Sequence, residues 1–185
     1  MKNSIDRRVR KTKNVLRHNL TLLLSQNDLK NITVKELCEI CDINRGTFYL
    51  HYKDIYDLFE QIEDEILYEF IGIINKYKYQ KEMSWKSVLL DLLKYISANA
   101  DIFKALLRTS ESVLLTRIID ISKPKSKKEW ILLLGDEKEQ YYDYYYAFIT
   151  EGCIAVVKAW VLDGMKETPE DMASLIGRMM TNSIN

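Results

Sequence analysis

A five-residue run near residue 45 carries the side chains best suited to contacts with nucleic acid. It consists of Arg45, Gly46, Thr47, Phe48 and Tyr49. On a helix in the DNA major groove, an arginine can donate two hydrogen bonds to a guanine, and a glycine permits close approach. The threonine offers a methyl group to a thymine or a hydroxyl to a phosphate. We expect Tyr49 to reach a phosphate or a base edge, and Phe48 to pack in the core.

Other hydrogen-bonding side chains flank this run. Lys35 is suited to a base or to a phosphate, and the sequence does not decide between the two. The remaining candidates for phosphate contacts are Thr33, His51, Tyr52 and Lys53. For Tyr49 and His51, packing against the following helix is the alternative interpretation.

Capping residues predict the first of the helices that would position these side chains. Thr33 and Glu36 fit a capping box, in which the threonine accepts from the Glu36 amide and the glutamate reaches back. The predicted helix buries Val34, Leu37, Cys38 and Cys41. It ends at Asp42, a residue type that tolerates the left-handed conformation of a tight turn.

Two further caps follow this turn. Asn44 is a suitable N-cap for a helix from Arg45 to about Tyr52. Asp54 caps a long helix from Ile55 to about Tyr77, and Asp57 favours its first turn electrostatically. The segment therefore reads as two short helices joined by a turn, followed by a long third helix.

An amphipathic helix from about Asp6 to Gln26 precedes this segment. Its apolar face consists of Val9, Leu16, Leu20, Leu23 and Leu24, and its basic residues are Arg7, Arg8, Arg10, Lys11, Lys13 and Arg17. A solvated charged face is the simple interpretation of such a run. Because the run lies just before the predicted helix pair, we favour phosphate contacts.

Charge is distributed unevenly along the chain. Residues 1–53 contain eleven Lys or Arg and five Asp or Glu, a formal charge of +6, whereas residues 54–185 contain 16 and 22, a charge of −6. A basic N-terminal third on an acidic remainder is typical of a small DNA-binding module joined to another domain. We therefore predict a domain boundary between residues 53 and 54.

The remainder is predicted to be helical, so the fold class is all-α. The chain has only two prolines and six glycines, which favours long uninterrupted helices. We expect helices at about 85–98, 101–107, 111–121 and 137–162, a loop at 122–129, and a last helix from Pro169. The 137–162 helix is apolar on more than one face, as in a helix that is buried on two sides.

The last helix carries a narrow apolar stripe. It includes Met172, Leu175, Ile176 and Met179. A terminal helix has little left to cover except a partner, so we predict that this stripe lies in a homodimer interface, with two helices from each protomer.

The three cysteines do not predict a metal site or a disulfide framework. Cys38 and Cys41 would share a helix face, but two thiolates alone do not complete a zinc site, and no nearby pair of histidines does so. We expect both, and Cys153, to be small packed residues. No arrangement of catalytic residues stands out, so we predict neither an enzyme nor a cofactor.

Nothing in the sequence indicates secretion or membrane insertion. The N-terminus lacks the apolar region of a signal peptide, and no apolar run approaches the roughly 18 residues of a membrane span. We expect a cytoplasmic protein.

The segment from Val34 to Phe59 resembles the DNA-binding head of the TetR family of transcriptional regulators. The shared features are Asn44-Arg45-Gly46-Thr47-Phe48-Tyr49, then His51-Tyr52 and Asp54. The chain departs from the family where Asp42 stands in place of a frequent glycine, Ile55 in place of a lysine, and Leu50 in place of a basic residue. The resemblance implies an N-terminal helix-turn-helix domain and a larger helical domain for effector binding and dimerisation.

The resemblance also implies how such a protein would act. A homodimer would bind a palindromic DNA operator, most commonly as a repressor, and an unknown small-molecule effector would move the 55–77 helix. Aromatic residues that would line the effector pocket are Phe70, Phe103, Tyr141, Tyr145, Phe148 and Trp160. Core packing is the alternative for each. The rival function is a helical adaptor or coactivator that keeps the fold without binding DNA, which Leu50 and Ile55 support.

Overall fold

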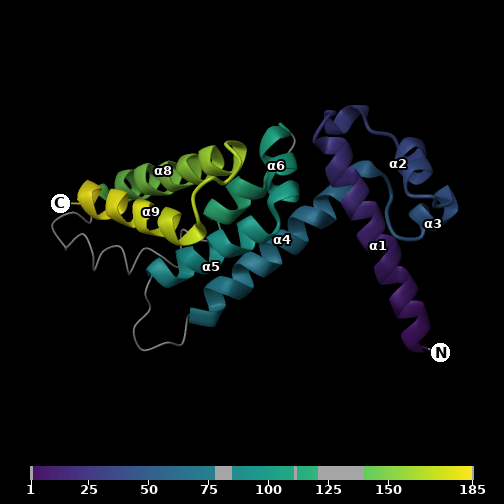
Figure 1. Ribbon diagram of the computed structural model, residues 1–185, viewed down its shortest axis with the longest axis horizontal. Coiled ribbons are helices and arrows are strands. Elements are labelled where there is room, and N and C mark those ends of the chain that lie inside the picture. Colours follow the sequence, from purple (N-terminus) through teal and green to yellow (C-terminus); the bar gives the residue numbers. More distant parts are fainter. Residues whose placement is uncertain (1, 78–84, 111, 121–139, 185) are drawn as a thin grey trace. The chain divides into compact units, whose positions relative to one another are not determined.

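The described part of the chain is built from helices (Figure 1). The computed structural model describes residues 2–77, 85–110, 112–120 and 140–184. No strand occurs in these ranges, so the predicted all-α class is confirmed. The elements are α1 (Lys2–Leu24), the 3₁₀ helix η1 (Leu29–Asn31), α2 (Val34–Ile40), α3 (Arg45–Tyr49), α4 (Ile55–Tyr77), α5 (Trp85–Ala98), α6 (Ala100–Arg108), a helical stretch over 114–120, α8 (Tyr142–Leu162) and α9 (Pro169–Ile184).

Most predicted helix limits agree with the structure. The limits of α4 and α5 are those predicted, and α6 differs by one residue at each end. The helix predicted from Arg45 to about Tyr52 is shorter in the structure, because α3 ends at Tyr49. The predicted start of α8 near 137 and the predicted loop at 122–129 lie outside the described residues.

Two compact units divide the chain. Unit 1 comprises residues 1–66 and 101–112, and unit 2 comprises residues 67–100 and 113–185. The division falls inside α4, so this helix contributes residues to both units. A compact unit is not the same as a functional domain, and the predicted boundary between residues 53 and 54 stays a prediction.

The core of unit 1 forms where α1, α2 and α3 meet the first half of α4. Its fully buried side chains include Leu16, Leu20, Leu37, Phe48 and Leu58. The predicted apolar face of α1 is confirmed for Leu16, Leu20 and Leu24, which are buried at helical spacing. This packing fixes α2 and α3 against α1, since helices of five and seven residues are not stable alone.

Unit 2 is organised around the pairing of α5 with α9. Leu93 and Ile96 of α5 are buried, as are Met172, Ala173 and Ile176 of α9. Lys94 on α5 forms a salt bridge to Glu170 on α9 at 2.9 Å. A second connection joins α4 to α5, where the Tyr77 hydroxyl and Lys76 both donate to the Asp91 carboxylate, at 2.7 and 2.8 Å.

The apolar stripe of α9 was predicted to lie in a homodimer interface, and the burial of two of its residues corrects this prediction. Met172 and Ile176 are 4% and 1% exposed, because the chain's own α5 and α8 cover this side of α9. These two side chains therefore have almost no surface left for a second protomer. Leu175 is half-buried and Met179 is exposed, and their place in an interface stays a prediction.

Helix α8 has one covered side and one open side. Tyr142, Tyr146, Ile149, Trp160 and Val161 are buried. By length and composition alone α8 could cross a bilayer, with 22% of its most apolar window buried. The expectation that no apolar run approaches the length of a span is thus wrong on this measure. A helix that packs in the core of a protein can have the same length and apolar composition.

Candidate nucleic-acid interface

The start of α2 is fixed by its predicted N-cap. The Thr33 hydroxyl accepts a hydrogen bond from the Glu36 backbone N–H at 3.1 Å, and Thr33 has extended backbone angles. One of the unpaired amides of the first helical turn is thereby satisfied. The cap sets the direction in which Lys35 leaves the helix, which makes it part of the candidate interface.

The turn between α2 and α3 has the geometry predicted for Asp42. This residue has φ 52, in the left-handed region. The Ile43 backbone N–H donates to the Cys38 carbonyl at 2.9 Å, a bond that closes the C-terminus of α2 in the manner of a Schellman motif. The left-handed residue reverses the chain within two residues and brings the start of α3 beside α2.

Asn44 is the N-cap of α3, as predicted. The Asn44 Oδ1 accepts a hydrogen bond from the Gly46 N–H at 2.7 Å. A Cβ added at Gly46 would lie 3.1 Å from this same oxygen. The glycine therefore leaves room for the cap and also presents bare backbone at the first turn.

The two sides of α3 differ in burial. Phe48 is fully buried and its ring meets that of Tyr49 edge to face, with centroids 5.5 Å apart. The prediction that Phe48 packs in the core is confirmed. On the other side Arg45, Gly46 and Tyr49 are exposed, with Tyr49 58% accessible, and Thr47 is half-buried. The structure thus brings together four of the residues that the sequence singled out.

Lys35 and Arg45 line one open surface hollow between α2 and α3. The rest of its lining is Cys38, Glu39, Asp42, Ile43 and Asn44. Neither Lys35 nor Arg45 forms a salt bridge with any residue in the described ranges. Two cations without such partners on one face can contact an anionic backbone or base acceptors. The carboxylates of Glu39 and Asp42 in the same hollow were not foreseen, although Lys35 and Glu39 stand at i and i+4.

The connection from α3 to α4 is held by reciprocal capping. Asp54 accepts from the Asp57 N–H at 2.8 Å, and Asp57 accepts from the Lys53 N–H at 2.7 Å. The Lys53 amide, followed by the Gln61 side chain, lowers the pKa of Asp57 below its ordinary value. The predicted cap at Asp54 is confirmed, and the second bond, which was not predicted, fixes the backbone at Lys53.

Tyr52 lies in the core rather than on the surface. It is buried, its ring packs at 5.6 Å from that of Phe48, and the Lys13 ammonium lies 5.5 Å from its centroid. Burial raises the pKa of the Tyr52 hydroxyl to about 12. The expectation of a phosphate contact is corrected here, because little of the side chain reaches solvent. Neighbouring His51 is half-buried.

The basic residues of α1 also divide. Arg7, Arg8, Arg10 and Lys11 are exposed. Arg17 instead forms a salt bridge to Glu65 of α4 at 2.6 Å, within unit 1. Arg17 therefore ties α1 to α4, while the exposed group at the start of α1 stays the predicted source of phosphate contacts.

The cysteines of α2 are packed thiols. Cys38 is buried, and the Cys41 thiol lies 3.7 Å from the Val15 carbonyl of α1. Burial raises the pKa of both, to about 11 for Cys41. In the described part of the chain, no three His, Cys, Asp or Glu side chains are placed to hold a metal ion. The geometry agrees with packing as the role of these residues.

The six aromatic residues predicted for an effector pocket occupy different environments. Phe103 belongs to unit 1 and the other five to unit 2. Phe70 is buried against Tyr95, with ring centroids 5.7 Å apart, and the Trp160 indole N–H donates to the Glu167 carbonyl at 3.0 Å. Tyr141 and Phe148 are exposed, and Tyr145 is half-buried. Their role stays a prediction.

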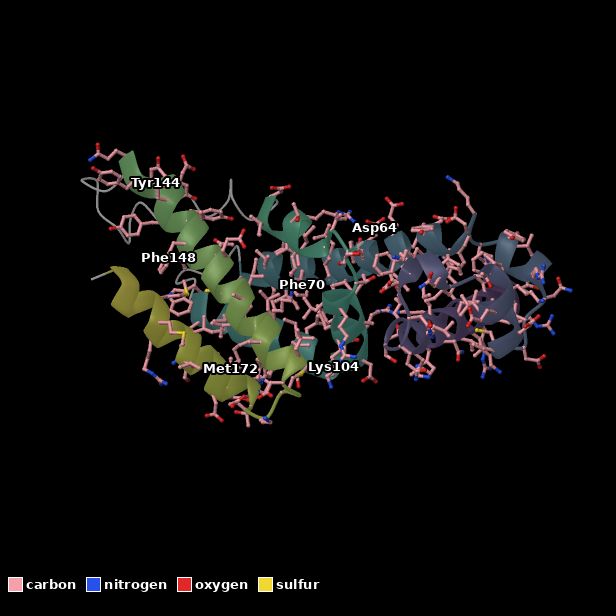
Figure 2. All side chains as sticks on the ribbon, turned by 90° about the horizontal axis from the view of Figure 1, so that it is seen from above. Asp64, Phe70, Lys104, Tyr144, Phe148 and Met172 are labelled. Carbon is pink, nitrogen blue, oxygen red and sulfur yellow. The ribbon has the colours of Figure 1, made fainter. Side chains whose placement is uncertain are left out.

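One apolar groove of about 160 Å³ lies between α8 and α9. Of the six predicted residues, Phe148 lines it, together with Ile149, Gly152, Cys153, Val156, Ile176, Met179 and Met180. Figure 2 shows Phe148 and Tyr144 on successive turns of α8. The open side of α8 was not visible from periodicity, because its apolar residues surround the helix.

Comparison with known proteins identifies the family of the C-terminal region. Residues 83–182 match a family described as the transcriptional regulator C-terminal region. Among curated proteins, none matches the chain by sequence.

Three solved structures share the fold at low identity. A TetR transcriptional regulator from Streptococcus agalactiae 2603V is 22% identical, with a TM-score of 0.64 over 97% of this chain and 99% of that one. The fatty acid degradation regulator FadR from Bacillus halodurans is 16% identical, with a TM-score of 0.67 over 91% and 94%. The dihydroxyacetone kinase operon activator DhaS is 18% identical, with a TM-score of 0.60 over 94% and 96%.

Proposed function

The chain belongs to the TetR family of transcriptional regulators, and from this premise we propose that it binds a palindromic DNA operator as a cytoplasmic homodimer. Each α3 would enter a major groove, with the two heads about 34–36 Å apart. The protein would act by binding, without catalysing a reaction, and repression is the expected outcome.

The observation that carries this proposal is the exposed surface of α2 and α3. Two caps and a left-handed turn hold Arg45, Gly46 and Tyr49 outward, and Lys35 shares the hollow beside Arg45. Arg45 is suited to a guanine, Thr47 to a thymine or phosphate, and Lys35, Lys53 and Thr33 to phosphates. Tyr49, which is 58% exposed, is suited to a phosphate or a base edge.

The open side of α8 supports the homodimer. Tyr144 and Phe148 are 77% and 67% exposed. Continuing at helical spacing, Gly152, Ala155, Ala159 and Leu162 are exposed as well. An aromatic and small-residue stripe of this length fits a second α8, and Met179 of α9 lies beside it in the groove. We therefore propose that the dimer interface lies mainly on α8 rather than on α9.

Five of the six residues predicted for the effector site, all except Phe103, lie in unit 2, and α4 would respond to a ligand bound there. Residues 55–66 of this helix belong to unit 1 and residues 67–77 to unit 2. A ligand changes operator affinity only if it binds the two conformations with different affinity. Of these five, Phe148 belongs to the proposed dimer surface, and Phe70, Tyr141, Tyr145 and Trp160 remain the candidates for the pocket.

Selection from a random duplex library, followed by fluorescence anisotropy with the enriched duplex, tests DNA binding. We expect Arg45→Ala to weaken binding about 10- to 100-fold, the contribution of a good bidentate contact. Lys30→Ala is the matched control, since Lys30 is an exposed cation of η1 in the same unit and forms a salt bridge with its neighbour Asp28 at 3.6 Å.

Salt dependence separates the proposal from the rival function. A regulator that contacts phosphates loses affinity steeply as salt rises, and Lys35→Ala should reduce the slope by about one. If no duplex is enriched, the helical adaptor that keeps the fold without binding DNA becomes the better description.

A further inference from the structure

Leu50 is the most exposed large apolar residue in the described ranges. Its side chain is 80% accessible. It has helical backbone angles, φ −71 and ψ −18, and its N–H donates to the Gly46 carbonyl at 3.2 Å. Leu50 therefore continues the helical path of α3 by one residue.

This continuation fixes the face on which Leu50 lies. In a helix, residues i, i+3 and i+4 share one side, so Leu50 stands beside Tyr49 and above Gly46. All three are exposed, whereas Phe48 points into the core. Leu50 thus belongs to the surface that the proposed function places against DNA.

The neighbours of Leu50 indicate what covers it. Arg45 and Lys53, five residues before and three residues after Leu50, are exposed as well, and neither forms a salt bridge in the described ranges. Exposed cations near an apolar side chain suit a polyanion. The apolar group that a major groove offers to a leucine is the C5-methyl of thymine.

We propose that Leu50 is a specificity-determining residue that contacts a thymine methyl group in each operator half-site. The inference rests on the proposed function and deepens it, because it names a base. A leucine cannot hydrogen-bond to a phosphate, which any sequence offers, but it can contact the methyl group that only thymine offers.

Replacement of thymidine by deoxyuridine isolates the proposed contact. The substitution removes one methyl group and leaves base pairing intact. In the duplex enriched by the wild-type chain, each thymidine is replaced in turn, symmetrically in both half-sites. At one position we expect the wild type to lose about fourfold in affinity per half-site, the effect of one buried methylene-sized group.

The variant Leu50→Ala completes a double-mutant cycle. It should bind the thymidine and deoxyuridine duplexes equally well at that position, and repeated selection with it should lose the preference for thymine there. Leu22→Ala is the matched control, because Leu22 is an exposed leucine on α1 in the same unit. It should keep the wild-type response.

The outcomes are distinct. If a duplex is enriched but Leu50→Ala retains every deoxyuridine effect of the wild type, Leu50 does not read thymine and only this inference is overturned. The same holds if Leu50→Ala binds with wild-type affinity, as it would if a protein partner covered Leu50. If no duplex is enriched, the proposed function and this inference fall together.

Discussion

The exposed surfaces of α3 and α8 both carry large apolar side chains, but their settings differ. At α3, Tyr49 and its neighbour Leu50 are exposed close in sequence to Arg45 and Lys53, neither of which forms a salt bridge in the described ranges, and Asn44 caps the helix. On α8, Tyr144 and Phe148 lead into a stripe of small residues over an apolar groove. Exposure alone therefore does not identify a partner. The polar surroundings of α3 suit it to nucleic acid. The apolar surroundings of α8 suit it to another apolar protein surface.

The largest effect should follow from a charge on the α8 surface. Phe148→Glu occurs twice in a dimer, and each lost burial of a phenylalanine side chain costs about 1.5–3 kcal/mol, so we expect the dimer dissociation constant to rise about a thousandfold. Analytical ultracentrifugation measures it. Operator affinity should fall with it, because one head alone contacts half a palindrome.

The control for this variant is Tyr68→Glu. Tyr68 of α4 is also highly exposed in unit 2 but lies on another helix. It should leave the dimer intact. An equal loss of dimer in both variants would show that the α8 surface has no special role.

The reactivity of the thiols provides a second comparison, between Cys41 in unit 1 and Cys153 in unit 2. With a pKa of about 11, Cys41 has about one thiolate per thousand at pH 8, and its labelling should be about a hundredfold slower in the folded chain than in the unfolded one. Cys153 lines the α8–α9 groove, and burial raises its pKa as well.

Labelling kinetics of single-cysteine variants would sharpen the comparison. Phe148→Glu should speed the labelling of Cys153, by opening the groove, without changing that of Cys41. A faster reaction of Cys41 in that variant would mean that the two units do not respond separately.

Loss of one helix cap should have a smaller effect. It should reduce stability in both regions but operator affinity only at α3. Asn44→Ala removes the acceptor for the Gly46 amide and should cost about 1 kcal/mol of stability, together with operator affinity. The matched change is Thr168→Ala, because Thr168 caps α9 by accepting from the Asp171 N–H at 3.1 Å. It should cost similar stability in chemical denaturation but leave the affinity of the remaining folded dimer unchanged.

The smallest effect concerns pH. The folded-state pKa of Asp57 is lowered by the Lys53 amide, so its carboxylate stabilises the fold above the unfolded pKa of about 4. This contribution is lost as the pH falls through the folded pKa. Asp57→Asn should therefore lower the free energy of unfolding at pH 7, and the difference from wild type should shrink below pH 4. A difference that stays constant down to pH 3 would exclude this origin.

The head could be predicted closely because its signals are local. Thr33, Asn44 and Asp54 each act on an amide two or three residues away, so residue type and spacing suffice. The surface position predicted for Tyr52 was wrong, because its burial depends on packing with Phe48 of α3 and Lys13 of the distant α1. The hollow beside Arg45 likewise depends on how α2 and α3 meet.

Unit 2 was less predictable because its surfaces depend on packing between helices that are distant in the sequence. Met172 and Ile176 form a stripe in the sequence, but whether a partner or α5 covers it is decided by tertiary structure. For α8, apolar residues on several faces conceal which face is open. Periodicity gives the direction of a side chain relative to its own helix, not what lies opposite.

The left-handed Asp42 also has a genetic consequence. An aspartate codon becomes a glycine codon by a single base change, and glycine adopts a φ of 52 without the cost of about 1 kcal/mol borne by other residues. The same change would remove one carboxylate from the hollow that holds Lys35 and Arg45. One point mutation therefore separates this chain from a more stable turn with a stronger attraction for any phosphate backbone. A lineage that retains the aspartate therefore retains a weaker non-specific attraction for DNA.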